Sequence, residues 1–510
     1  MIYSGLAASK NNAQIPLFYN DKPMHSKYSP EKEGEVFASY FKEGFIITAG
    51  LGGGFHIKAL LQKFNQSFII CVEADKESLD FCLSLNENKL LLENKNIIFT
   101  TPDFLEEEII KNYIPPLYEN FTLEFQRAWL TNNEDAAKKI QLAAKSALEK
   151  VSADFSVQSH FGKQWQRNLL LNLKNFSKNP YVKTDLSKTA LICAAGPGLE
   201  NSLSFIKKQR ASYFIICADT SYGTLLESSI FPDAVVSVDS QHVSCQHFYH
   251  FNKSKTLFVF DITSSPDAVR KACENGNDIF FIKSAHPLSR LLCRNTDIPF
   301  INTGSGTVTI GCVDFARFLG FQKIQITGAD FAYTNGKPYA KGTYLEKQYL
   351  SRNNRFKTEE ELYCTLMFRT ETERIGNDES ICLFKYSMPA KNSFTTQILN
   401  RYRLSLDKYL ADSNFDEKER NVFFTAQSGK NPAEEKSQLN KTEKTFSYKK
   451  SVEDFCNKIA LVMDSKDFIL TQETASLLPF ACYLKRNSAT SRLGNIELIK
   501  LAYSNFRRYN

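Results

Sequence analysis

The sequence predicts an α/β protein with a Rossmann-like N-terminal domain, a central doubly wound domain with a mostly parallel sheet, and a helical C-terminal region. Three observations lead to this prediction. A glycine-rich turn follows the apolar run at residues 45–49, apolar runs alternate with helical segments between residues 190 and 327, and such runs fade past residue 350. Strands that alternate with helices are typical of a parallel sheet covered by helices.

The first region has the order of a nucleotide-holding domain. A strand-like run leads into a turn that contains Gly50, Gly52 and Gly54. After a helical stretch, the strand-like run Phe68–Val72 ends at Glu73. Glycines let backbone N–H groups approach a phosphate, and an acid at a strand end can bind ribose hydroxyls. A turn of this kind also serves close packing alone, and we favour that role over a second nucleotide site.

The patterns divide the chain into four regions. We expect a Rossmann-like domain at 1–125, a helical connector at 126–185, the central domain at 186–350 and a mainly helical region at 351–510. The connector has apolar positions at three- and four-residue spacing, as an amphipathic helix does. Residues 428–444 are poor in apolar side chains, which predicts a mobile linker.

The strand-like runs of the central region end in small or polar residues, and ligands of a doubly wound sheet bind at these ends. The predicted strands are Phe45–Ala49, Phe68–Val72 and Ile97–Thr100 in the first region, and Ala190–Ala194, Tyr213–Cys217, Ala234–Val238, Leu257–Phe260, Ile279–Ile282 and Ile324–Thr327 in the central one. The candidate nucleotide-binding residues are Gly196, Pro197, Gly198, Asp219, Asp239, Ser305, Gly306 and Asp330. Small residues at a helix start can receive a phosphate, whereas tight turns and helix caps are the alternative roles.

Composition limits the partners. Of the 510 residues, 43% are hydrophobic and 23% charged, as in globular proteins. No apolar run approaches the roughly 18 residues of a membrane-spanning helix, and the N-terminus lacks a signal-peptide pattern, so we expect a cytoplasmic protein without a membrane span. The net charge of +7 is mild, and no basic stripe or aromatic RNA-reading motif is present, so nucleic acid is not an expected partner.

Cysteines and histidines do not indicate a metal site. The twelve cysteines are scattered singly without a CxxC pair, which predicts buried reduced thiols. His242, Cys245, His247 and His250 lie close together, but their spacing matches no standard zinc pattern. We therefore expect them on a solvated or partly packed helix. No cofactor is expected to be required, and assistance by Mg²⁺ stays open.

Four motifs of the central region resemble those of a known family. They read AAGPGLEN from residue 194, CADTSYGTLLESSIFPDAVVSVDS from 217, TGSGTVTIGCVDFARFLGFQKIQITGADFAY from 303 and NGKPYAKGT from 335. This order is similar to the central domain of the motility-associated factor (Maf) flagellin glycosyltransferases. The flanking HFGKQWQRNLLLNLKNF and SFTTQILNRYRLSLDKYL, with GLGGGFH in the first region, extend the resemblance over residues 40–410. The central domain also resembles 6-hydroxymethylpterin pyrophosphokinase-like proteins and, distantly, bacterial sialyltransferases that use CMP-activated sugars.

The resemblance implies transfer of a nonulosonic, sialic-acid-like sugar from a CMP donor to Ser or Thr hydroxyls of flagellin, for flagellar assembly and motility. Carried over by motif, the glycine turn holds the nucleotide, Asp219 and Asp239 contact it, and Ser305 and Gly306 lie by the donor sugar and phosphate. In the sialyltransferases, two tyrosines after the last motif steady the departing phosphate.

Tyr333 and Tyr339 match those tyrosines, and Lys337 can add a positive charge. The general base has no counterpart, because the sialyltransferases place a histidine after the tyrosines whereas the last histidine here is His286. Position 339 is also Tyr where Maf sequences commonly have His. Asp239 and Asp330 are then the candidate bases, unless a largely dissociative transition state needs little base catalysis.

Two other functions fit the same sequence. One is an ATP-dependent pterin pyrophosphokinase-like enzyme, which the resemblance of the central domain suggests. The other is a non-catalytic flagellin-binding protein.

Overall fold

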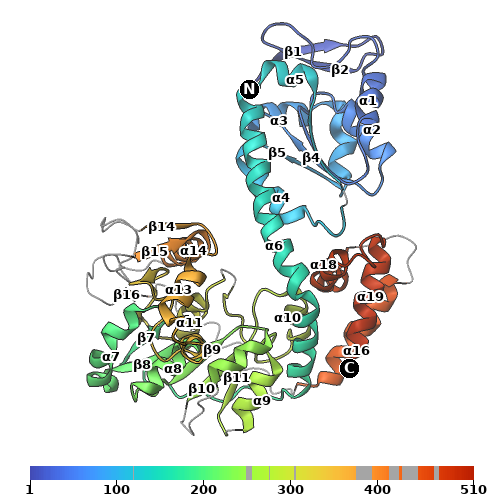
Figure 1. The fold of residues 1–510 in the computed structure, drawn as a ribbon. Coiled ribbons are helices and arrows are strands. Elements are labelled where there is room, and N and C mark those ends of the chain that lie inside the picture. Colours follow the sequence, from blue (N-terminus) through green and yellow to red (C-terminus); the bar gives the residue numbers. More distant parts are fainter. Residues whose placement is uncertain are drawn as a thin grey trace. The chain divides into compact units, whose positions relative to one another are not determined.

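The computed structural model describes residues 1–118, 120–248, 256–274, 276–303, 306–374, 393–412, 424–427, 446–463 and 470–509. They form two compact units (Figure 1), one of residues 1–162 and 478–499 and one of residues 163–477 and 500–510. These boundaries differ from those of the four predicted regions, because one long helix, α6 (Glu134–Lys174), runs through most of the predicted connector. The predicted mobile linker at 428–444 lies outside the described residues.

The N-terminal unit is built on a four-stranded parallel sheet with strand order β5-β4-β3-β6. Its strands are β3 (Phe45–Ala49), β4 (Phe68–Val72), β5 (Ile97–Thr100) and β6 (Phe121–Phe125), preceded by an antiparallel hairpin of β1 (Tyr3–Ala8) and β2 (Gln14–Phe18). The helices of this part are α1 (Pro30–Ser39), α2 (Phe55–Lys63), α3 (Lys76–Leu83), η1 (Asn86–Glu93), α4 (Pro102–Asn112) and α5 (Arg127–Asn132). The prediction of β3, β4 and β5 is confirmed residue for residue. The sequence patterns miss β6, an edge strand whose side chains are only partly buried and form no continuous apolar run.

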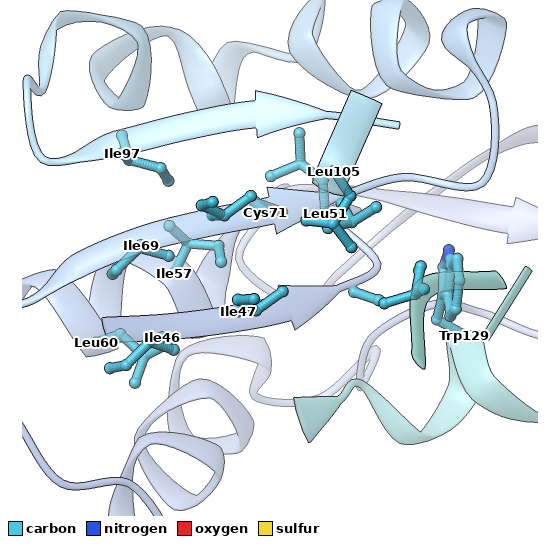
Figure 2. Close-up of a cluster of buried hydrophobic side chains, with 14 of the residues drawn as sticks. Ile46, Ile47, Leu51, Ile57, Leu60, Ile69, Cys71, Ile97, Leu105 and Trp129 are labelled. Carbon is cyan, nitrogen blue, oxygen red and sulfur yellow. The ribbon is translucent and has the colours of Figure 1, made fainter. Parts of the chain in front are cut away.

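The core of this unit explains why β3 and β4 can be predicted from the sequence. Ile46, Ile47, Ile69 and Cys71 are all fully buried. Helices cover both faces of a parallel sheet, so its inner strands read as continuous apolar runs. Figure 2 shows these side chains on the strands, with Trp129 beyond the carboxyl end of β3.

The central unit contains a seven-stranded sheet with the order β11-β10-β9-β8-β7-β12-β16, parallel except for β16. Its strands are β7 (Thr189–Cys193), β8 (Tyr213–Ala218), β9 (Ala234–Ser237), β10 (Leu257–Asp261), β11 (Ile279–Ile282), β12 (Lys323–Thr327) and β16 (Phe424–Gln427). The six parallel strands match the predicted ranges to within one residue at each end. The order reverses at β7, since β8 to β11 extend to one side of it and β12 lies on the other. In an open parallel sheet such a reversal makes a crevice at the carboxyl ends of the strands.

The remaining elements connect and follow this sheet. They are η2 (Arg210–Ser212), η3 (His242–Phe248), α7 (Gly198–Lys208), α8 (Asp219–Glu227), α9 (Pro266–Glu274), α10 (Pro287–Leu292), α11 (Val308–Phe318), α12 (Tyr344–Leu350), α13 (Glu359–Met367), α14 (Gln397–Asp412), α16 (Tyr448–Met463), α17 (Gln472–Ser476), α18 (Leu478–Arg486) and α19 (Asn495–Arg507). The region past residue 350 is mainly helical as predicted, but it also contributes β14 (Thr372–Arg374), β15 (Ser393–Thr396) and β16. The first two join β13 (Tyr333–Thr334) in a small antiparallel sheet. Strands this short carry no alternation from which they can be predicted.

Side-chain amides at the C-terminal end of α6 hold the loops at the carboxyl ends of the strands. The Asn168 amide donates to the carbonyls of Ser240 (2.9 Å) and Thr263 (3.1 Å). One turn later, the Asn172 amide donates at 2.9 Å to two carbonyls of the loop after β10. Both asparagines are buried. The loop after β9, which carries Asp239, is therefore fixed by a helix that precedes the sheet in sequence.

This arrangement predicts that Asn172→Ala destabilises the central unit. The substitution leaves two carbonyls without their amide donor, and each unsatisfied buried group costs about 1–3 kcal/mol. We therefore expect the free energy of unfolding of the central unit to fall by about 2–4 kcal/mol. Urea unfolding followed by circular dichroism measures it. Asn175→Ala, at an exposed position, is the matched control and is expected to stay within about 0.5 kcal/mol. Equal losses in the two variants would contradict a role for the Asn172 bonds.

Candidate active site at the carboxyl edge of the central sheet

The predicted phosphate turn lies at the reversal of strand order and is filled by the chain itself. The Gly196 N–H donates to the Gly328 carbonyl at 2.7 Å. The Gly198 N–H, in the first turn of α7, donates to Oδ2 of the buried Asp330 at 2.9 Å. A Cβ on either glycine would overlap the Asp330 carboxylate. The glycines, with Pro197 between them, thus permit close approach of two strand-end loops.

This contact changes the role of the turn. The N-terminus of a helix attracts anions, and here the carboxylate of Asp330 already occupies that position on α7. A phosphate at the same amide would have to displace a buried negative charge. In this arrangement Gly196, Pro197 and Gly198 pack against the loop after β12, and the Asp330 carboxylate accepts the first amide of α7.

Asp219 is the first residue of α8 and is buried at the end of β8. Its Oδ1 accepts the Thr220 N–H at 2.7 Å and its Oδ2 accepts the Ser237 hydroxyl at 2.7 Å. The carboxylate thus ties the ends of the neighbouring strands β8 and β9 together. It also supplies a fixed negative charge at this edge of the sheet.

Asp239 follows β9 and is half-buried. Its Oδ1 accepts the Gln241 N–H at 2.8 Å. Burial raises the pKa of Asp239, the nearby Asp219 carboxylate raises it further, and a charged His247 lowers it. Asp219, Asp239 and His247 are therefore electrostatic neighbours, although they follow two different strands.

A pocket of about 360 Å³ opens beside these acids. Residues from α8, η3 and the segment around α12 line it: Thr220, Gly223, Gln246, His247, Gly342, Tyr344, Lys347 and Gln348. The His247 and Tyr344 rings meet edge to face, with centroids 4.5 Å apart. The Lys347 ammonium lies 2.7 Å from the carboxylate of Glu227.

Close backbone packing forms one wall of the pocket. A Cβ on Gly223 of α8 would overlap the carbonyl of Gly342, so only glycine lets the segment before α12 approach α8. Gly342 itself has φ +91°, a left-handed conformation that favours glycine. The segment after the predicted tyrosine motif therefore folds back over the strand ends.

The predicted tyrosines lie near this pocket without lining it. Tyr339 is 40% exposed, and desolvation by the surrounding protein, with Tyr344, Tyr333, Tyr402 and Asp219 nearby, raises the pKa of its phenol to about 12. The phenol thus stays protonated and able to donate to an anion. Among the described residues, the phenol and ammonium that line the pocket belong to Tyr344 and to a lysine of the same helix.

Tyr333 and Lys337 flank a tight turn. Tyr333 is half-buried in β13, where burial raises its pKa. Lys337 is exposed and follows Asn335 and Gly336, whose φ values of +53° and +77° belong to a two-residue hairpin turn. Neither Tyr333 nor Lys337 is among the residues that line the pocket.

The structure describes only one of the two residues predicted to lie by the donor sugar and phosphate, Ser305 and Gly306. Ser305 lies outside the described residues. Gly306 has φ +77°, and a Cβ there would overlap the ring of Tyr402, which is also a neighbour of Tyr339. This places Gly306 in the surroundings of the tyrosines.

The histidine cluster separates in three dimensions. His242 is exposed and pairs with Asp267 at 2.9 Å, Cys245 is buried, and His247 faces the pocket. His250 lies outside the described residues. In the part of the chain that the structure describes, no group of three His, Cys, Asp or Glu side chains is arranged to hold a metal ion. Sequence spacing gave no sign that His247 faces the pocket, because η3 is a 3₁₀ helix and its partner Tyr344 is distant in sequence.

Comparison with known proteins places this site in a known fold. Residues 163–336 match a family described as 6-hydroxymethylpterin diphosphokinase MptE-like. The structure of a Maf glycosyltransferase from Magnetospirillum magneticum AMB-1 superposes with a TM-score of 0.52 at 14% identity, over 99% of this chain and 90% of that one. The predicted fold class is confirmed.

Relatives in sequence come from Treponema pallidum (strain Nichols). One uncharacterized protein is 39% identical over 155 residues, or 30% of this chain and 51% of that protein. The match thus spans about half the length of that relative. Another uncharacterized protein is 34% identical over 149 residues, or 28% of this chain and 70% of that protein. The chain belongs to this family, Maf-like in fold and MptE-like in its central domain.

The glycine turn of the N-terminal unit in this Maf-like chain is closed by its own side chains. A Cβ on Gly50 would overlap Trp129, and one on Gly52 would overlap His25. The Gly54 position faces Asn88 in the same way. The three glycines of the predicted second nucleotide turn therefore each allow a close contact within the unit.

The Glu73 carboxylate also accepts hydrogen bonds from within the unit. It is fully buried, and its oxygens accept the Trp129 indole N–H (2.5 Å), the Tyr3 hydroxyl (3.1 Å) and the N–H groups of Leu51 (2.9 Å) and Ala74 (3.0 Å). Burial raises the pKa of Glu73, and these bonds partly oppose the shift. A ribose has no access to this carboxylate.

A helix that crosses a bilayer must be both long and apolar. In the described residues, none combines the length and the apolar character needed to cross a bilayer.

Proposed function

We propose that this chain is a glycosyltransferase that moves a nonulosonic, sialic-acid-like sugar from a CMP donor to Ser or Thr hydroxyls of flagellin. The observation that carries the proposal is the pocket at the carboxyl edge of the central sheet, within a fold shared with a Maf glycosyltransferase. Its volume suits a nucleotide, since ligand pockets span about 300–1,000 Å³.

The pocket chemistry supports a nucleotide. Tyr344 offers an aromatic ring to a base, and the amides of Gln246 and Gln348 can hydrogen-bond to its edge. Lys347 adds a positive charge, and the nearby Tyr339 is a protonated phenol that can donate to a departing phosphate. In this proposal Asp239 lies beside the reacting groups, where its charge acts on the site.

Ligand-dependent stability tests the donor class. CMP at 100 times its dissociation constant is expected to stabilise the folded protein by about 2.7 kcal/mol, because a ligand that binds only the folded state must do so. Tyr344→Leu is expected to abolish the rise in melting temperature with CMP. Tyr349→Leu, on the same helix but packed on Tyr363, is the control that keeps it. Stabilisation by ATP and a pterin but not by CMP would favour the diphosphokinase function that the MptE-like match suggests.

Transfer itself is measured by incubating the protein with a CMP-nonulosonic acid and flagellin. The expected result is added sugar mass on Ser or Thr residues of flagellin. An unchanged flagellin mass with a competent donor would overturn the proposal. A non-catalytic flagellin-binding protein would instead keep modification intact in cells that carry Asp239→Asn.

A further inference from the structure

His247 combines a position in the pocket with a fixed ring orientation. It belongs to η3, directly after the loop that carries Asp239, and it lines the pocket. Its ring packs edge to face on Tyr344 at an interplanar angle of 89°, next to the fully buried Phe248. Packing on two sides holds the imidazole against the space that a substrate would enter.

The ring has a nitrogen to spare for a substrate. His247 Nδ1 is shielded from solvent, and no hydrogen-bond partner for it exists among the described residues. A neutral imidazole has one donor and one acceptor nitrogen, and both are donors once it is protonated. A buried ring nitrogen without a protein partner is costly unless a ligand supplies the bond.

Charged groups from several elements surround the His247 ring. Asp239 interacts with His247 electrostatically and would stabilise an imidazolium. Asp219 adds a second negative charge at the start of α8. From α12, Lys347 opposes them, but its ammonium is paired with Glu227. Asp267 and Lys271 of α9, which packs against η3, act on Cys245 two residues earlier.

The other acids and histidines considered as bases are hydrogen-bonded within the chain, paired with another side chain, or outside the pocket lining. Asp330 accepts the first amide of α7, and both oxygens of Asp219 are bonded within the chain. His242, on the same 3₁₀ helix, is exposed and paired with Asp267. His286 is half-buried and is not among the residues that line the pocket.

We propose that His247 is the general base that activates the acceptor hydroxyl, with Asp239 as the residue that stabilises its protonated form. This inference rests on the proposed transferase function. The imidazole takes the proton of the Ser or Thr hydroxyl as its oxygen bonds to the anomeric carbon. The bond from that carbon to the phosphate oxygen breaks, and CMP leaves with the electron pair. The proton on His247 then passes to solvent, which restores the base.

His247→Gln tests the assignment in the full chain. General-base catalysis contributes about 10²–10⁴-fold, so kcat for sugar transfer is expected to fall at least about 100-fold. The fall in kcat is expected to exceed any change in the CMP-induced rise in melting temperature or in the KM for the donor, because His247 borders the donor pocket but the base acts on the acceptor. The pH–rate profile should lose its acidic limb, because the wild-type base must be unprotonated to act. His242→Gln, on the same helix, is the matched control and should keep wild-type kcat.

Each outcome decides the assignment. A His247→Gln enzyme with kcat within about fivefold of wild type, or with the acidic limb intact, overturns the base while leaving the transferase function standing. Loss of the CMP-induced stabilisation in parallel with kcat also overturns it, because His247 would then act in donor binding. Absence of transfer by the wild-type protein overturns the proposed function, and the base with it.

Discussion

Glu73→Ala is expected to destabilise the N-terminal unit by about 3–5 kcal/mol. The substitution removes an acceptor from three buried donors, those of Tyr3, Trp129 and Leu51, and from the partly buried Ala74 N–H. These donors come from the first strand, from α5, from the glycine turn and from the end of β4. The carboxylate therefore links four segments of the unit, and we expect its loss to destabilise the unit as a whole.

Two further variants separate the contribution of the bonds from that of side-chain volume. Glu73→Gln keeps the shape but offers one acceptor oxygen in place of two, so we expect it to cost less than Ala, about 2–3 kcal/mol. Glu107→Gln, an exposed position on α4, is the control and should stay within about 0.5 kcal/mol. Urea unfolding followed by circular dichroism gives all three values. Wild-type stability in Glu73→Ala would show that the carboxylate is free for another role, such as ribose binding.

Acid is expected to destabilise both units through buried histidines. Burial lowers the pKa of His286 from 6.5 to about 4. In the unfolded chain this side chain takes up a proton near its ordinary pKa, whereas in the folded chain it resists protonation until about pH 4. The stabilisation is therefore complete above pH 6.5 and is lost as pH falls from 6.5 to 4, by about 3 kcal/mol in all. His25, with its pKa lowered to about 4, and His56, with its pKa lowered well below 6.5, give the N-terminal unit the same trend.

His286→Phe isolates this effect in the central unit. The phenyl ring preserves the edge-on contact with Trp165, whose ring centroid lies 5.6 Å away, and it cannot be protonated. Between pH 7 and 4.5 the variant should lose about 2–3 kcal/mol less than wild type, because other groups titrate equally in both. His242→Gln, at an exposed position, should keep the wild-type pH dependence. An identical slope in wild type and His286→Phe would contradict a suppressed pKa.

Part of the candidate site could be predicted from the sequence. Asp219 and Asp239 were predicted at strand ends, and the structure places both beside a pocket at that edge. The tyrosine motif was predicted near the reacting groups, and Tyr339 lies among the pocket's electrostatic neighbours. His247 was set aside because its spacing indicated no metal, and spacing along the chain says nothing about which side chains a 3₁₀ helix turns toward a distant segment.

By itself, the sequence determined the fold class and the parallel strands, because a strand buried on both faces needs an unbroken apolar run such as Phe45–Ala49 or Ile279–Ile282. It also located glycine turns after β3 and β7. Only the tertiary structure decided which sites stay open to a ligand. Trp129 fills the first turn and Asp330, 132 residues from Gly198, caps the second, while the backbone approach of Gly223 and Gly342 leaves a pocket beside them. Such occupancy depends on contacts between segments far apart in the chain, which local sequence patterns do not encode.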